Sequence, residues 1–148
     1  MVLVDGEGTP LGVSVEAASP AEVNLLEPML DTVRVKKGRR PGRPRKNPDR
    51  LILDKAYDSN PLRKRLARKG IEPIIPARST HKKATHQDGR KLKRYKNRWK
   101  VERTNAWIQN FRRIYVRYDR SEIIYSGFVH LACAMVTLKK LERATREF

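Results

Sequence analysis

The sequence has one cysteine, Cys133, so no disulfide can form within the chain. It has no uninterrupted apolar run of about 20 residues, the length that a membrane-spanning helix needs, and no charged-then-apolar leader follows Met1. These absences predict a soluble, cytoplasmic protein of a reducing compartment with no membrane partner. The length of 148 residues suits one domain at most.

Acidic residues are also scarce, because 16 Asp and Glu stand against 34 Lys and Arg and give a net charge of +18. Residues 1–33 hold six of these acids and no Lys or Arg, so the rest of the chain carries 34 basic against 10 acidic residues, or +24. That much positive charge repels itself unless a polyanion lies nearby. We therefore expect DNA or RNA to bind the later part of the chain through salt-dependent phosphate contacts. A generically basic nuclear or ribosomal protein would have the same composition.

Local patterns predict an α/β chain without internal repeats. In chain order they predict a β-hairpin over residues 1–15, a helix over 20–30 begun by Ser19-Pro20, a buried strand over 51–53, a helix over 59–69 closed by Gly70, and an edge strand over 71–77. Residues 78–93 are expected to form a loop, and residues 95–114 a helix. An amphipathic helix over 122–143 completes the chain, with an apolar part too short and too polar to span a bilayer.

Residues 34–50 combine nine basic side chains with three prolines and two glycines, which predicts an exposed basic loop. Within it, Arg40–Lys46 resembles an AT-hook, in which arginines point into an A·T-rich minor groove. Sequence-tolerant contact with phosphates is the favoured interpretation, and Arg43, Arg45 and Lys46 are the residues expected to make it.

Two carboxylates are placed where they could do chemistry. Asp54 directly follows a buried strand, which would hold it rigidly at the open end of a sheet, where α/β proteins keep their sites. Glu102 shares a helical stripe with Tyr95 and Arg98 at about 100° per residue, so an acid would be flanked by cations. Phosphoryl transfer on DNA uses carboxylates to hold divalent metals. An ordinary turn Asp and a solvated Glu paired to a neighbouring Arg are the alternatives.

The blocks Leu53-Asp54-Lys55-Ala56-Tyr57-Asp58-Ser59 and Tyr95-Lys96-Asn97-Arg98-Trp99-Lys100-Val101-Glu102-Arg103 resemble bacterial insertion-sequence transposases of the DDE superfamily, in the group of insertion sequences four and five. The similarity covers nearly the whole chain. The second block is the more specific, because Tyr95, Arg98 and Glu102 match the family signature Y-x-x-R-x-x-x-E.

The resemblance implies a ribonuclease H-like sheet flanked by helices, with two Asp and one Glu that bind Mg²⁺ or Mn²⁺ to cut and rejoin DNA. By motif, Asp54 would be the second acid and Glu102 the third. The residues implied to contact DNA or order the site are Tyr95, Arg98, Arg103 and Arg113. The family usually has a Lys seven residues after the Glu, where this chain has Gln109.

The family's first catalytic Asp is absent, because it lies on a strand upstream of the hairpin with which this sequence begins. Asp5 sits in a turn and is not expected to replace it. We therefore expect residues 1–148 to be a partial DDE catalytic domain, with helices over 94–148, that is inactive and folds poorly without an upstream transposase fragment or a full-length transposase. Its DNA would be the transposon ends, in the nucleoid. The alternative is a non-catalytic DNA-binding remnant or regulator of transposition.

Overall fold

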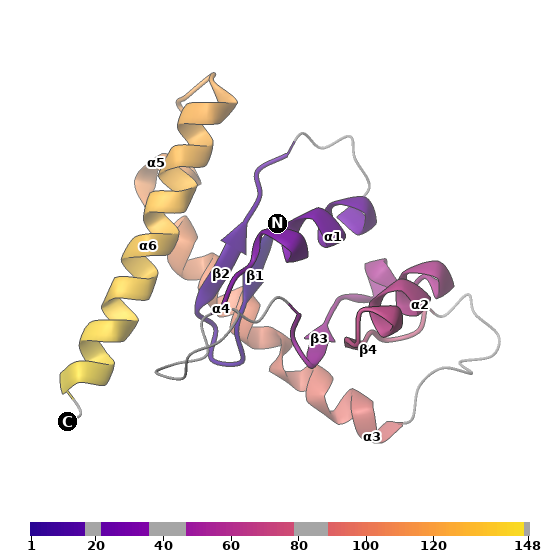
Figure 1. Ribbon diagram of the computed structural model, residues 1–148. Coiled ribbons are helices and arrows are strands. Elements are labelled where there is room, and N and C mark those ends of the chain that lie inside the picture. Colours follow the sequence, from indigo (N-terminus) through magenta and orange to yellow (C-terminus); the bar gives the residue numbers. More distant parts are fainter. Residues whose placement is uncertain (17–21, 36–46, 79–88, 147–148) are drawn as a thin grey trace. The chain divides into compact units, whose positions relative to one another are not determined.

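The computed structural model describes residues 1–16, 22–35, 47–78 and 89–146 (Figure 1). Contacts divide the chain into two compact units, which we call the hairpin unit (residues 1–20 and 99–148) and the central unit (residues 21–98). Each is described by itself. Both combine helices with a two-stranded sheet, so the predicted α/β class is confirmed.

The hairpin unit opens with the predicted β-hairpin, formed by β1 (Val2–Val4) and β2 (Pro10–Val13). The strands are antiparallel, with Val2 opposite Val13 and a register shift after Leu3. The turn between them is rich in Gly, and Gly8 has a φ of 82°, a conformation that side chains with a Cβ rarely adopt. The apolar alternation and the turn residues were enough to predict this hairpin.

Three helices complete the hairpin unit: α4 (Trp99–Gln109), α5 (Arg112–Tyr115) and α6 (Glu122–Arg146). α4 packs on β1, and α6 packs on β2 and α4. Their shared core consists of Ile108, Ala132, Cys133 and Val136, with partly buried aromatic rings around it. The final helix is therefore confirmed and extends to Arg146.

The single helix predicted over residues 95–114 is wrong. Residues Lys93–Arg98 form a 3₁₀ helix, η2; α4 begins only at Trp99; and the chain breaks again between Gln109 and Arg112. A 3₁₀ helix has three residues per turn and an α-helix 3.6, so one wheel cannot describe both. The residue pattern over 95–114 indicated helical structure but did not indicate this change of pitch.

The central unit contains α1 (Glu22–Thr32), β3 (Arg50–Ile52), the 3₁₀ helix η1 (Lys55–Tyr57), α2 (Asn60–Arg68), β4 (Glu72–Ile74), α3 (Gly89–Leu92) and η2. β3 and β4 pair in parallel, with Leu51 opposite Pro73. α2 is the connection between them and ends before Gly70, whose φ is 74°. The strand–helix–strand order predicted from the sequence is confirmed, although the first strand begins one residue earlier than predicted and the second is shorter.

The core of the central unit lies between α1, α2 and the β3–β4 pair. Leu62, Leu66, Ile71 and Ile75 are buried almost completely, as are the apolar residues of α1 that face them. Burying side chains of this size stabilises the fold by about 1.5–3 kcal/mol each. This core fixes the position at which β3 ends.

Several predictions fall outside the described residues. They include the Ser19-Pro20 helix start, most of the basic loop over 34–50 with its AT-hook-like motif, and residues 79–88 of the loop predicted over 78–93. Two parts of that loop are described. Arg78 lies outside the helices and strands, as predicted, whereas residues 89–93 are helical in α3 and at the start of η2, so the prediction is wrong there.

Among the described residues, β1 pairs with β2 and β3 with β4, and no strand joins the two pairs. The central strand that a ribonuclease H-like sheet would place there stays a prediction. α6 has 25 residues and is, within the described ranges, the one helix long and apolar enough to cross a membrane. The prediction that it is too short and too polar for that is therefore wrong, although one face of α6 packs on the core of the hairpin unit.

Candidate functional site

Asp54 lies between the end of β3 and the start of the 3₁₀ helix η1. The strand ends at Ile52, Leu53 is buried, and Asp54 caps η1 by accepting a hydrogen bond from the backbone N–H of Lys55 through Oδ1 at 2.5 Å. The side chain of Asp54 is 43% exposed, so a rigid backbone presents an accessible carboxylate. This is the placement that the sequence predicted for it.

Tyr95 and Arg98 both reach Asp54. Arg98 Nη1 donates to Asp54 Oδ2 at 2.9 Å and to the hydroxyl oxygen of Tyr95 at 2.9 Å, and the Tyr95 hydroxyl lies 3.5 Å from Asp54 Oδ1. The arginine also lies 5.8 Å from the centre of the tyrosine ring. Two residues of the Y-x-x-R-x-x-x-E signature and the acid 41 positions before Tyr95 therefore form one cluster, which we call the Asp54 cluster.

The pitch of η2 explains this pairing. In a 3₁₀ helix, residues three apart lie on the same face, so Tyr95 and Arg98 point to the same side. η2 also packs against β3, whose end carries Asp54. The spacing Y-x-x-R was visible in the sequence, but its partner was not, because residues 54 and 95 are brought together only by folding.

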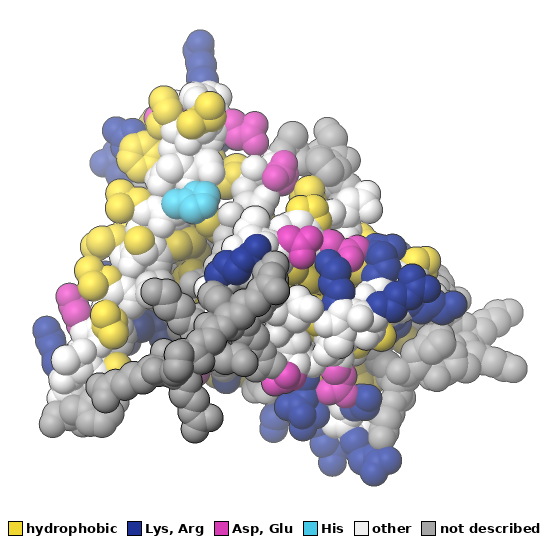
Figure 2. Space-filling view, in the orientation of Figure 1, with side chains coloured by type: hydrophobic (Ala, Val, Ile, Leu, Met, Phe, Trp, Pro, Cys, Tyr) yellow, Lys and Arg dark blue, Asp and Glu magenta, His cyan; other side chains and the backbone are white. Residues whose placement is uncertain are grey.

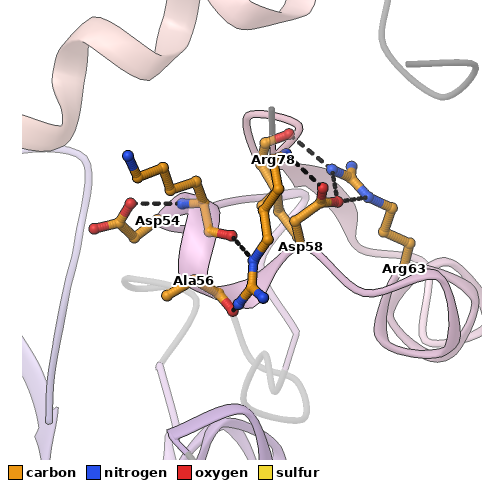
Figure 3. A network of polar contacts seen from close by, with 7 residues as sticks. Asp54, Ala56, Asp58, Arg63 and Arg78 are labelled. Atoms are coloured by element: carbon orange, nitrogen blue, oxygen red, sulfur yellow. Dashed lines mark hydrogen bonds and ion pairs between the residues drawn. The ribbon is translucent and has the colours of Figure 1, made fainter. Parts of the chain in front are cut away.

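A second network of polar contacts holds residues 55–58, which directly follow Asp54 in the chain (Figure 3). Asp58 is buried and accepts from Arg63 Nη2 at 2.8 Å and Nε at 3.1 Å, and from the backbone N–H of Arg78 at 2.8 Å. Arg78 in turn donates to the carbonyl oxygens of Lys55 and Ala56 at 3.1 and 2.6 Å.

The sequence analysis did not predict this role of Asp58. In the structure, the carboxylate of Asp58 links η1, α2 and the residue that follows β4 by four positions. Such charge-assisted hydrogen bonds in a buried place hold a backbone segment in one conformation. Asp58 thus positions residues 54–58, and with them Asp54.

Glu102 lies in the hairpin unit, in the first turn of α4, and its side chain is exposed. That turn is fastened to the β-hairpin. Lys100 donates to the carbonyl of Gly6, Arg103 to that of Glu7 at 2.9 Å, and buried Thr104 to that of Gly8 at 2.7 Å. The hairpin turn therefore fixes the start of the helix on which Glu102 stands.

Gly8 is required for this close approach. A Cβ built at Gly8 would lie 3.1 Å from Thr104 Oγ1 and from Arg103 Nη2, and 3.2 Å from the carbonyl oxygen of Lys100. Lys140 of α6 closes the contact by donating to Glu7 O at 3.0 Å and to Thr9 Oγ1 at 2.8 Å.

The arginines predicted to grip DNA have various surroundings. The guanidinium of Arg103 lies 4.6 Å from the ring centre of Trp99 and 4.7 Å from that of Trp107, so it packs between two indoles while it holds the hairpin. Arg113 is exposed, lies 4.7 Å from the ring of Phe128 and pairs with Asp119 at 3.6 Å. Arg43, Arg45 and Lys46 lie outside the described residues.

The Asp54 cluster supplies one ligand of the kind that a hard cation takes, the carboxylate of Asp54, which already pairs with Arg98. Carboxylate oxygen is the ligand that Mg²⁺ prefers, and the carboxylate of Asp54 is accessible. Within the described ranges, no three His, Cys, Asp or Glu side chains cluster closely enough to hold a metal ion. Asp54 and Glu102 belong to different units, so their convergence on one cation stays a prediction.

The sequence matches a family model described as a transposase DDE domain over residues 1–137. It is 36% identical over 143 residues to a protein of Burkholderia cepacia described as a transposase for insertion sequence element IS402. The aligned residues make up 97% of this chain and 64% of that protein. A protein of Brucella ovis, described as a transposase for insertion sequence element IS6501, is 33% identical over 90 residues, or 60% of this chain and 67% of that protein. No solved structure matches the chain.

Proposed function

Because the chain belongs to the family of transposase DDE domains, we propose that it is the C-terminal part of a catalytic domain that cuts and joins DNA at the ends of an insertion sequence. The observation that carries the proposal is the Asp54 cluster, in which the tyrosine and arginine of the signature contact an accessible acid at the end of a strand. An ordinary turn Asp would not need two partners from a segment 41 residues away.

Asp54 and Glu102 are the residues proposed to hold the metal, with a third Asp supplied from upstream. A pair of Mg²⁺ or Mn²⁺ ions would lower the pKa of a bound water and neutralise charge on the scissile phosphate. In this chain, Arg98 fixes the orientation of the Asp54 carboxylate, and the Tyr95 hydroxyl fixes Arg98. The Asp58 network and the Gly8–Thr104 contact hold the two acids on rigid backbone.

DNA is proposed to lie along the basic surface of the chain. Its charge supports phosphate contact, since residues 34–148 carry +24. The side chains of Arg98 and Arg113 are 36% and 58% exposed, and Arg43, Arg45 and Lys46 add positive charge between residues 34 and 50. Arg103 is proposed to act mainly by holding the hairpin and the two indoles, because both kinds of contact already engage it.

We further propose that the chain is inactive alone. It spans 64% of the length of the IS402 relative, and two acids cannot fix two metal ions as three do. The ribonuclease H-like sheet would be completed by a strand from an upstream polypeptide. Without it, backbone groups at the edge of a strand pair would lack a strand partner, which predicts a broad thermal transition for the isolated chain.

The second candidate is a DNA-binding product that regulates or competes with a full-length transposase. The strong positive charge favours it independently of any catalytic acid. The two candidate functions differ in whether they depend on the carboxylate of Asp54. Neutralising Asp54 would abolish cleavage but would slightly strengthen binding of a polyanion.

The test is a strand-cleavage assay with Mg²⁺ or Mn²⁺ on DNA that bears the ends of the element. The chain is supplied alone, and then with the polypeptide encoded directly upstream, in both wild-type and Asp54→Asn forms. We expect nicking only in the reconstituted wild-type sample, with Glu72→Gln as a control acid that keeps activity. Asp54-dependent nicking by the chain alone would refute its inactivity, and reconstituted nicking that survives Asp54→Asn would refute the proposed site.

A further inference from the structure

One side of α6 changes from apolar to basic along its length. Its first part is buried in the core of the hairpin unit and consists of Val129, Ala132, Cys133 and Val136. Its continuation, within the same sector of about 120° around the helix axis, consists of Lys139, Lys140 and Arg143. Figure 2 shows hydrophobic side chains along α6 and basic ones near its C-terminal end. The side of α6 that packs on the core therefore ends in three cations.

A pocket of about 260 Å³ lies where this side of α6 becomes basic. The aromatic rings of Trp107 and Phe111 line it, together with the amide of Asn110 and the three cations of α6. All of these residues belong to the hairpin unit. No Asp or Glu is among the described residues that line the pocket. The pocket thus combines flat aromatic surfaces with uncompensated positive charge.

The three cations of the pocket repel one another. Arg143 is four residues from Lys139 and three from Lys140, and like charges at these helical spacings are unfavourable. The dipole of α6 stabilises cations in its last turn, which includes Arg143 but neither lysine. Lys140 donates to Glu7 O and Thr9 Oγ1, and its ammonium has a third N–H that can donate to a ligand. A phosphate among these side chains would replace their repulsion by charge-assisted hydrogen bonds.

The aromatic rings of the pocket suit a flat, largely apolar group. Trp107 and Phe111 are partly buried and pack against the core, so their positions are fixed. The guanidinium of Arg103, which does not line the pocket, lies 4.7 Å from the ring centre of Trp107. Asn110 is exposed, and its amide has the donors and the acceptor that recognise the edge of a base. Nucleobases stack on aromatic side chains of this kind.

We propose that this pocket binds one nucleoside phosphate, with the base against the two rings and the phosphate among the three cations. Its volume is below the range of about 300–1,000 Å³ of sites for drug-sized ligands, which limits the ligand to one small unit. The site goes beyond the proposed cleavage chemistry, because it shares no residue with the Asp54 cluster and Glu102 lies about 140° around α4 from Trp107. A free nucleotide and an unpaired nucleotide of a DNA strand present the same chemistry.

The first experiment uses the fluorescence of Trp107, which a stacked base quenches. Trp99, which is 48% exposed, is changed to Phe so that Trp107 is the one indole left. The purified, nucleic-acid-free chain is titrated with 5′-dAMP and with deoxyadenosine, and inorganic phosphate is added as a competitor. We expect saturable quenching by 5′-dAMP. The other two should bind more than about tenfold more weakly, because each lacks either the stacked base or the charged group.

Charge reversals test the basic part of the pocket. Lys139→Glu and Arg143→Glu should each weaken the binding of 5′-dAMP more than about tenfold, because a donor to the phosphate becomes a carboxylate that repels it. Arg120→Glu is the matched control, an exposed residue beyond the other end of α6. It lies at least about 25 Å from the cations of the pocket, farther than the screening length of about 8 Å, and should leave binding unchanged. Far-UV circular dichroism checks that each variant is folded.

A comparison of two DNA duplexes identifies the source of the nucleotide. The duplexes have the same sequence, but one is fully paired and the other has a single bulged adenosine. If the pocket takes a nucleotide of DNA, the bulged duplex should quench Trp107 and bind more tightly than the paired one, and Arg143→Glu should remove this difference. If the pocket takes a free nucleotide, 5′-dAMP should bind and the two duplexes should behave alike.

Three outcomes would overturn the proposal. One is the absence of saturable quenching of Trp107 by both 5′-dAMP and the bulged duplex. Another is inorganic phosphate that competes as strongly as 5′-dAMP binds, because the rings would then contribute nothing. The third is equal weakening by Arg143→Glu and Arg120→Glu, which would mean general attraction to a basic chain. None of these measurements involves DNA cleavage, so such a failure would leave the proposed catalytic role of Asp54 untouched.

Discussion

A single nitrogen of Arg98, Nη1, lies 2.9 Å from Asp54 Oδ2 and 2.9 Å from the hydroxyl oxygen of Tyr95. The guanidinium therefore links the acid at the end of β3 to the first residue of the Y-x-x-R pair. Both partners of the ion pair are more than a third exposed, so water screens their attraction. A contact this accessible contributes more to the orientation of a carboxylate than to the stability of the fold.

Replacing Arg98 should therefore affect binding and not folding. We expect Arg98→Ala to change the free energy of unfolding by less than about 1 kcal/mol, since exposed ion pairs contribute no more than that. It should weaken DNA binding measurably at fixed salt, because a phosphate-binding cation is lost. Urea denaturation and fluorescence anisotropy measure the two effects. A loss of stability of several kcal/mol with unchanged DNA binding would make Arg98 a structural residue.

Breaking the buried Asp58–Arg63 pair should be far more costly. The side chains are only 5% and 11% exposed, so Asp58→Ala leaves the Arg63 guanidinium buried without its carboxylate. We expect a loss of about 3–5 kcal/mol in the free energy of unfolding. Glu72→Ala removes a carboxylate from exposed pairs with Arg50 and Lys91, which water screens, and should cost far less than Asp58→Ala. Equal losses would show that the Asp58 network is not what holds residues 54–58.

The three glycines at turns should rank in a definite order when changed to Ala. Gly8→Ala meets both a positive φ and three atoms within 3.2 Å, so we expect about 2–4 kcal/mol of destabilisation. Gly70→Ala meets a positive φ in open space and should cost about 1–2 kcal/mol. Gly6→Ala meets neither and should stay within about 0.5 kcal/mol of the wild type. Thermal or urea unfolding of the three variants checks this order.

Asp5 should make the stability of the chain depend on pH. Burial raises the pKa of Asp5, but hydrogen bonds from the backbone of Thr9 and Glu7, the Thr9 hydroxyl and the charge of Lys140 together hold that pKa below its ordinary value. A lowered folded-state pKa contributes stability above the ordinary value of about 3.9 and loses it as the pH falls through the folded-state pKa.

Asp5→Asn keeps an oxygen that can accept from the N–H groups of Glu7 and Thr9 but cannot ionise. The wild type should therefore be more stable than Asp5→Asn at pH 6, and the difference should shrink as the pH falls through the folded-state pKa of Asp5. Urea unfolding of both proteins at several pH values measures this difference. A difference that is constant with pH would contradict the assigned role of the Asp5 charge.

Much of the local structure followed from the sequence by itself. The hairpin, α1, α2 with its glycine end, the paired strands around Asp54 and the long last helix are set by apolar periodicity, turn residues and caps, which act over a few residues. The signature residues Tyr95, Arg98 and Glu102 and the family were also recognisable there, because their spacing is a linear property.

Only the tertiary structure decided which distant residues meet. Asp54 contacts Arg98 because η2 packs on β3. Asp58 contacts Arg63 and Arg78 because α2 and the residues after β4 lie around it. Gly8 contacts Thr104 because α4 packs on β1. The change from 3₁₀ to α-helix at Trp99 arises in the same way, since residues on its two sides pack in different units. Contacts across tens of residues depend on the packing of whole elements, which no short pattern encodes.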